Sequence, residues 1–501
     1  MKLNPKLWLF LGILLLPLML TNQSLWLDEG CTAMYAIQSD LQSWWHYLRT
    51  DTYSDCQMPL SMLVAWITAH TFGIQEWELR AINLLWGGLT LIALFRVGKR
   101  IHLPWLPALL AIQPYFWFYT NEARPYSLEI AIGAWILAGF VEFLNSEAAG
   151  KSWAWILAAT GVCLCYTTML APPTLGAVLL TGGLIAWKYQ WKISRKSFLI
   201  LAAGTIATLP AAIYYVSTLA RGSGGAQIWK VDAKFFGYVI YELTGMTGIG
   251  PAVEKIRELA KSHNIHAAFA QYGPQLALTG FCFLLLGTIL ILGLRNRQNW
   301  NKISAGILIV VVLVSSVFLL VGLAVQKAFW ARHFAPIFPF YVALLGISIS
   351  GILTSRKPYA KPLILLFISL LIFSTLNLRW SDRHRKEDYR FAAQLAHQAL
   401  DAKKSVWWIA APFNAEYYQL KCAFYHPVEG KVFSPCSPCK KLSQEPPEAL
   451  PVDLTKVPQP DLIILSKPDV FDSFGQIQAI IRDGGYKQSG SAQAFTFWTR
   501  Q

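Results

Sequence analysis

Long apolar segments constrain this chain more than any other feature. Eleven runs approach or exceed the length of about 17 residues that a helix needs to cross a bilayer. They lie near 7–22, 80–97, 104–119, 126–144, 152–168, 171–187, 197–219, 274–294, 303–325, 335–354 and 361–378. Only 14% of the residues are charged, whereas about a quarter are charged in soluble proteins. The sequence therefore predicts a polytopic α-helical membrane protein with about 11 transmembrane helices.

The basic residues indicate how the chain is threaded. One further apolar run, 58–73, is short. Whether it crosses the membrane decides on which side every later loop lies. If it does not cross, Lys and Arg gather in the short loops of one side, as expected of cytoplasmic loops. We therefore predict that 58–73 lies in or dips into the outer interface, with the N-terminus inside and the C-terminus outside. The net charge of +15 is spread over these loops, so no nucleic-acid partner is expected.

This threading places three large segments on the extracytoplasmic side, namely 23–79, 220–272 and 379–501. The last of them predicts a soluble α/β domain that follows a membrane domain over 1–378. Helical spacing covers 388–404 and 474–485, and strand-like apolar runs cover 405–411, 461–466 and 494–500. A Pro-rich stretch, 435–460, predicts a long loop. Short loops and a single outer domain favour a bacterial inner membrane.

A few charged residues lie at the outer ends of the spans, where charge is costly and usually functional. Asp28 and Glu29 directly follow the first apolar run, with no basic residue beside them in the sequence. The others on this side are Asp55, Arg80, Glu122, Arg124 and Arg332 with His333. A carboxylate at this level can deprotonate a hydroxyl, while the planar fork of arginine suits a lipid-linked phosphate. Interfacial snorkelling and mutual ion pairing are the alternative interpretation.

Five stretches then resemble, in order, a known family. They are "LWLDEGCTA", "DCQMPLSML", "FGIQEWELRAINLLWG", "NEARPYSLEIA" and "WARHFAPIFPF". Together they resemble the polyprenyl-phosphate-sugar-dependent glycosyltransferases of the GT-C superfamily, close to glycosyltransferase family 39 and the protein O-mannosyltransferases. The resemblance covers roughly 7–354. It implies a lipid bilayer, a polyprenyl-phosphate-sugar donor and a hydroxyl acceptor on a lipid, glycan or protein.

The resemblance also implies roles for individual residues. Asp28 corresponds to the family's catalytic base, and its neighbour Glu29 is expected to be a catalytic residue beside it. The Arg-x-Tyr element matches Arg124 and Tyr126, and the late Arg-Tyr matches Arg332, with His333 in place of Tyr. These four residues are the expected ligands of the donor phosphate.

Asp55, Gln57 and Arg80 are expected in a substrate-binding loop. The family's Asp-x-His-Pro-Pro-Leu stretch begins here at Asp55, but Gln57 replaces His and Met58 replaces the first Pro. Because glutamine is a poorer metal ligand than histidine, the resemblance leaves open whether a divalent metal ion is a cofactor.

Two alternatives remain at this stage. A transporter or flippase of polyprenyl-linked glycans would also have many spans and outer arginines, although it would not need a long acidic first loop or a soluble domain. In that domain, Cys422, Cys436 and Cys439 with His426 could form a zinc site. A loop disulfide in an oxidising compartment is the favoured interpretation.

Overall fold

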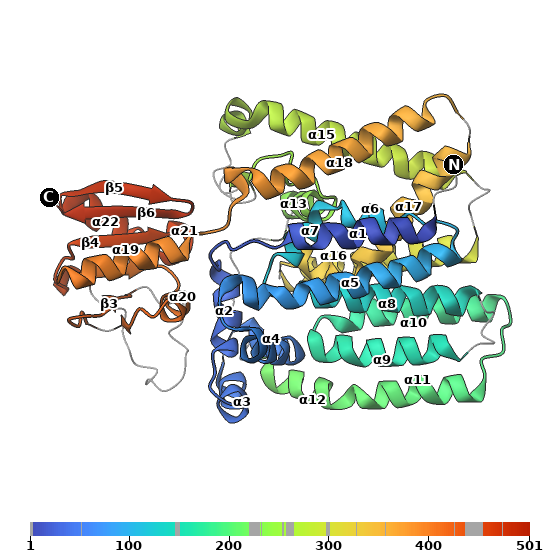
Figure 1. The fold of residues 1–501 in the computed structure, drawn as a ribbon, viewed down its shortest axis with the longest axis horizontal. Coiled ribbons are helices and arrows are strands. Elements are labelled where there is room, and N and C mark those ends of the chain that lie inside the picture. The colour runs from blue at the N-terminus through green and yellow to red at the C-terminus, as the bar shows by residue number, and fades with distance from the viewer. Residues whose placement is uncertain are drawn as a thin grey trace.

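A bundle of helices carries a smaller sheet region at one end (Figure 1). The computed structural model describes residues 4–51, 53–145, 151–219, 231, 233–252, 255–256, 265–296, 301–326, 328–355, 357–424, 426–435, 454–472 and 474–500. Cys436, Cys439 and most of the predicted Pro-rich loop lie outside these residues. The choice between a disulfide and a zinc site therefore stays a prediction.

Seven helical segments of the described chain are long and apolar enough to cross a membrane. They are α5 (Glu76–Arg100), α8 (Tyr126–Asn145), α11 (Arg195–Ala207) with α12 (Leu209–Thr218), α15 (Ile265–Arg295), α16 (Lys302–Val325), η4 (Ala331–Ile337) with α17 (Phe338–Thr354), and α18 (Ala360–Trp380). The other predicted runs lie on α1 (Pro5–Met19), α6 (Leu106–Ala111) with α7 (Pro114–Thr120), α9 (Ser152–Thr167) and α10 (Ala171–Lys188). The predicted class, a polytopic helical membrane protein, is confirmed.

The predicted span 104–119 is not one continuous helix. The chain forms the short helices α6 and α7, with an extended Gln113 between them. Pro114 begins α7; proline has no N–H to donate to a preceding turn and forces the residue before it out of the helical region. Pro114 therefore accounts for the break between α6 and α7.

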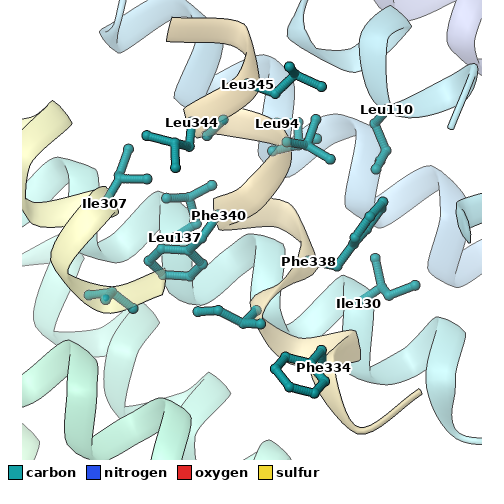
Figure 2. Close-up of a cluster of buried hydrophobic side chains, with 14 of the residues drawn as sticks. Leu94, Leu110, Ile130, Leu137, Ile307, Phe334, Phe338, Phe340, Leu344 and Leu345 are labelled. Carbon is teal, nitrogen blue, oxygen red and sulfur yellow. The ribbon is translucent and has the colours of Figure 1, made fainter. Parts of the chain in front are cut away.

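The core of the bundle surrounds α8 and α17. In the spanning window of α8, 94% of the residues are buried, and the figure for η4 with α17 is 83%. Figure 2 shows side chains from α5, α6, α8, α16, η4 and α17 meeting in this core. A Cβ atom added to Gly133 of α8 would lie 2.0 Å from the carbonyl oxygen of Pro336. This close approach seats η4 against α8 and brings the start of α17 to the start of α8.

The segment after α1 folds at the end of the bundle that faces the sheet (Figure 1). It comprises α2 (Leu27–Ala36), α3 (Leu41–Thr50), η1 (Ser54–Gln57) and α4 (Pro59–Phe72). Helix α4 covers the run that is predicted to lie at the interface. It has 14 residues and is not among the seven candidate spans. The short α13 (Ala233–Leu243) packs against η4 from the other large loop.

The C-terminal region is a six-stranded sheet with flanking helices. Its strands are β1 (Val406–Ile409), β2 (Cys422–Ala423), β3 (Val432–Phe433), β4 (Leu462–Ser466), β5 (Tyr486–Ala492) and β6 (Phe495–Arg500). The order is β2-β3-β1-β4-β6-β5; the first four are parallel, and β6 and β5 are antiparallel to their neighbours. The shorter elements are η5 (Asp382–His384), α19 (Tyr389–Asp401), α20 (Pro412–Tyr417), η6 (Leu454–Lys456), α21 (Pro468–Phe471) and α22 (Gln476–Asp483).

The three predicted strands and two predicted helices of this region are confirmed as β1, β4, β6, α19 and α22. Strands β2, β3 and β5 were not predicted. The first two have two residues each, and β5 carries mostly exposed polar residues along one edge of the sheet. Apolar patterning therefore gave no signal for them.

Candidate active site

Three carboxylate–arginine pairs meet where the bundle faces the sheet. Each joins segments that are far apart in the sequence. They are Glu29–Arg80, Asp55–Arg124 and Asp28–Arg332. The side chains of the first pair are 0% exposed and those of the second 4%, whereas those of the third are 28% exposed for arginine and 21% for aspartate. Of these three pairs, Asp28–Arg332 is the one that a substrate can reach.

Glu29 and Arg80 form a closed pair inside the protein. Arg80 Nε donates to Oε1 of Glu29 over 2.8 Å, and an Nη donates to Oε2 over 2.6 Å. The Ala123 N–H donates to Oε1 over 2.7 Å, and the Trp26 N–H to Oε2 over 3.3 Å. Burial raises the pKa of Glu29, but the charges of Arg80 and Lys386 and these hydrogen bonds outweigh it and lower the pKa to about 2.

This geometry is at odds with two expectations. Glu29 was expected beside the chemistry and Arg80 in a substrate-binding loop, yet both side chains are fully enclosed. Arg80 also donates to the backbone carbonyls of Thr21, Gln23 and Ser24. The pair therefore fastens the start of α2 to α5.

The Arg124 side chain is likewise held within the protein, in contact with the backbone of Asp28. One Nη donates to Asp55 Oδ1, to the backbone oxygen of Asp28 over 3.0 Å and to Thr32 Oγ1 over 2.9 Å. It thereby ties η1 to α2. The cavity beside it, lined mainly by apolar side chains of α4, α5 and α8, has a volume of about 30 Å³. That is room for one or two water molecules, so this cavity is too small for a substrate.

Asp28 lies in the first turn of α2, and its partner Arg332 lies on η4. Burial raises the pKa of the Asp28 carboxyl, but Arg332, Arg124 and Lys467 outweigh it and lower the pKa below its usual value. Asp28 is therefore ionised at neutral pH. It has the charge of a general base, and its proton-accepting oxygen is held by an arginine.

Tyr126, His333 and Gln57 are close in the sequence to Arg124, Arg332 and Asp55, and each makes contacts of its own. The Tyr126 ring is buried, 5.9 Å from the guanidinium carbon of Arg124. His333 packs edge-on against Phe329. Gln57 is directed toward α12, where its amide donates to the Thr218 carbonyl over 3.4 Å.

Lys386 is a residue that the sequence analysis missed. It lies between α18 and α19, and its Nζ is 3.2 Å from Glu122 Oε1 and 3.6 Å from Glu29 Oε2. Burial and the neighbouring carboxylates of Glu29 and Asp28 raise the pKa of Glu122 to about 7, although Lys386 opposes them. In the sequence Lys386 belongs to a charged run, "DRHRKED". Such a run predicts a solvated linker, so no signal pointed to a buried lysine.

Two further groups lie near Asp28 and Arg332. Glu242 on α13 accepts hydrogen bonds from the Tyr238 hydroxyl and the Ala331 N–H, and burial raises its pKa to about 7. Lys467 follows β4, pairs with Glu387, and is close enough to Asp28 to lower its pKa. Neither residue could be predicted from the sequence, because the position of both depends on how the loop and the sheet dock.

The acidic side chains do not fit a divalent cation. Among the described residues, no group of three or more His, Cys, Asp and Glu side chains is arranged to hold a metal ion. Asp28, Glu29 and Asp55 each face an arginine instead. A cation that bound one of these carboxylates would have to displace its guanidinium partner.

No protein-family model and no curated protein sequence matches the chain. Solved structures do resemble it. ArnT from Cupriavidus metallidurans matches with a TM-score of 0.55 in the apo state and 0.56 bound to undecaprenyl phosphate, both at 13% identity over 98% of this chain and 97% of ArnT. The arabinofuranosyltransferase AftD from Mycobacteria matches with a TM-score of 0.47 at 12% identity, over 99% of this chain and 39% of AftD. The ArnT match shows that the chain has the GT-C fold.

Proposed function

We propose that the protein is a membrane glycosyltransferase, which moves a hexose or pentose from a polyprenyl-phosphate donor to a hydroxyl acceptor on a lipid, glycan or protein. We place the reaction on the extracytoplasmic face of a cell inner membrane. The observation that carries the proposal is the partly exposed pair of Asp28 and Arg332. A general base and a phosphate ligand are thereby side by side at the end of the bundle. The GT-C fold shared with ArnT, which was crystallised with undecaprenyl phosphate, supports the same reaction class.

Asp28 removes the acceptor's proton in this reaction. The acceptor oxygen forms a bond to the anomeric carbon as the bond from that carbon to the phosphate oxygen breaks, through an oxocarbenium-like state. The proton goes to Asp28, and the polyprenyl phosphate leaves with the bonding electrons. A positioned base contributes about 10²–10⁴-fold to such a step, and Arg332 stabilises the charge that develops on the phosphate.

The donor has to compete for Arg332. With no substrate bound, the arginine pairs with Asp28. A donor phosphate that takes over the guanidinium leaves Asp28 without its nearest cation and beside a new anion. Both changes raise the pKa of the carboxyl. Donor binding therefore makes Asp28 a stronger base at the moment when the acceptor needs one.

The buried charged residues have a structural role. We assign Glu29, Arg80, Asp55 and Arg124 to holding α2 in place, because each is buried and paired with an opposite charge within the protein. Tyr126 and His333 remain predicted ligands of the donor phosphate, and Gln57 remains a predicted residue of the substrate-binding loop. The transporter alternative has no observation in its favour among the described residues.

The direct test is transfer in vesicles. Purified protein is reconstituted and supplied with a panel of synthetic polyprenyl-phosphate sugars and simple hydroxyl acceptors. We expect release of polyprenyl phosphate together with a glycosylated acceptor for at least one donor. Movement of the lipid-linked sugar across the bilayer without its cleavage would contradict the proposal and favour a flippase.

Arg332→Lys tests the phosphate ligand. Lysine keeps the charge but loses the planar fork, so the donor KM should rise about tenfold, the value for one lost charge-assisted hydrogen bond. Arg96→Lys is the matched control, since Arg96 pairs with Glu142, a residue near the far end of α8. Equal donor kinetics in both variants would remove Arg332 from the site.

The sidedness is tested by cysteine labelling in a background without reactive native thiols. Thr71, exposed on α4, and Ser152, exposed at the start of α9, are each replaced by cysteine. A membrane-impermeant thiol reagent added outside should label position 71 and leave position 152 unlabelled. The reverse pattern would place the site on the cytoplasmic face.

A further inference from the structure

The sheet region is built into the end of the bundle. Met34 of α2 belongs to the hydrophobic core of the sheet region, together with Trp407, Trp408 and Tyr389. Helix α20, which follows β1, packs directly on α2. A domain tethered only by its linker would need none of these contacts. The sheet region is therefore placed to control where α2 lies.

Hydrogen bonds from the sheet region hold the residues that lead into α2. The Tyr418 hydroxyl accepts from the Leu25 N–H over 3.1 Å and donates to Glu76 Oε1 over 2.9 Å. Arg390 donates from its Nε to the same Glu76 oxygen over 2.7 Å, and its backbone N–H donates to Ser24 Oγ over 3.0 Å. The residues just before Asp28 are thus held from the sheet side, while Arg80 holds them from the bundle side.

The tightest of these contacts is between Asn414 and Gly30. A Cβ atom added to Gly30 would lie 2.2 Å from Oδ1 and 2.4 Å from Cγ of Asn414. Asn414 is completely buried, and its amide faces the carbonyls of Leu25 and Trp26 at 3.5 and 3.4 Å. The side chain therefore has little room to rotate away. Glycine at position 30 lets α20 approach the first turn of α2 to within contact of its backbone.

We propose that Gly30 is a positioning residue: because it has no side chain, it leaves room for Asn414 and lets the first turn of α2, with the Asp28 carboxylate, lie where the reaction needs it. The inference rests on the proposed function, because it gives Asp28 a reaction to perform. Asp28 is two residues from Gly30 on the same short helix, so a shift of the turn moves the carboxylate with it. A displacement of about 1 Å can reduce catalysis about 10²-fold.

The test is a size-exchange experiment. Gly30→Ala should lower turnover by about 10–100-fold while the donor KM changes by less than about threefold, because Arg332 lies on another element. Asn414→Ala alone should stay within about threefold of the parent, since its amide contacts are long. The double variant should recover to about the level of Asn414→Ala. Gly88→Ala is the matched control, because an added Cβ there meets nothing within 4 Å.

Thermal unfolding of the same four variants is the second readout. The unfolding temperature should fall in Gly30→Ala and return in the double variant, whether or not a substrate is present. A double variant as slow as Gly30→Ala, or a fully active Gly30→Ala, would overturn the inference. If Gly30→Ala does not fold, recovery of folded, active protein on adding Asn414→Ala still tests it. An inactive parent would instead overturn the proposed function, so the two failures are distinguishable.

Discussion

Asp28→Asn is expected to lower the turnover of sugar transfer by about 10²–10⁴-fold, because an amide cannot take the acceptor's proton. The protein should still fold, since asparagine is nearly isosteric and the side chain is 21% exposed. Donor affinity should be kept or improve, because the variant no longer holds Arg332 with an opposite charge. Turnover per folded molecule and donor binding are measured on the same preparation.

Asp382→Asn is the matched control for this experiment. Asp382 is another arginine-paired aspartate, but its side chain is 79% exposed and lies just beyond α18. It should transfer sugar at the parental rate. Full turnover in Asp28→Asn would refute the assignment of the base and leave the pair with Arg332 as a structural contact.

Glu29→Gln is expected to act on stability, although Glu29 is the next residue along the chain. Arg80 would be left as a buried charge with 0% exposure and without its carboxylate. Breaking a buried pair in this way costs about 3–5 kcal/mol, which is a large part of a protein's stability. We expect a much lower unfolding temperature in detergent and a poor yield of folded protein.

Two controls separate this effect from catalysis. Glu142→Gln removes a carboxylate whose partner Arg96 is 42% exposed, so it should cost about 0–1 kcal/mol. Replacing both members of the buried pair, as Glu29→Gln with Arg80→Met, should recover part of the lost stability because no unpaired charge remains. A Glu29→Gln protein that folds normally but transfers no sugar would instead restore a catalytic role for Glu29.

The sequence determined the class of the protein and the level of its site. Apolar runs with few charges predicted the helical membrane fold, because the bilayer excludes unpaired backbone and charge. Short apolar runs predicted β1 and β4, the central strands of the sheet region. The charges left at the outer ends of the spans pointed to Asp28, Arg124 and Arg332, which the structure brings together.

Only the tertiary structure decided what each of these charges does. Asp28 and Glu29 are adjacent, but neighbouring residues on a helix point about 100° apart. The Asp28 carboxylate therefore points toward Arg332, where both side chains are partly exposed, and the Glu29 carboxylate points toward Arg80 in the interior. Which face of α2 is buried depends on how it packs against α5, η4 and the sheet region. Arg80 lies 51 residues further along the chain than Glu29, and Arg332 lies 304 residues further along than Asp28. That packing cannot be predicted from the local sequence. The local sequence marked both residues as candidates, and the burial that separates a base from a structural anchor arose from the long-range contacts.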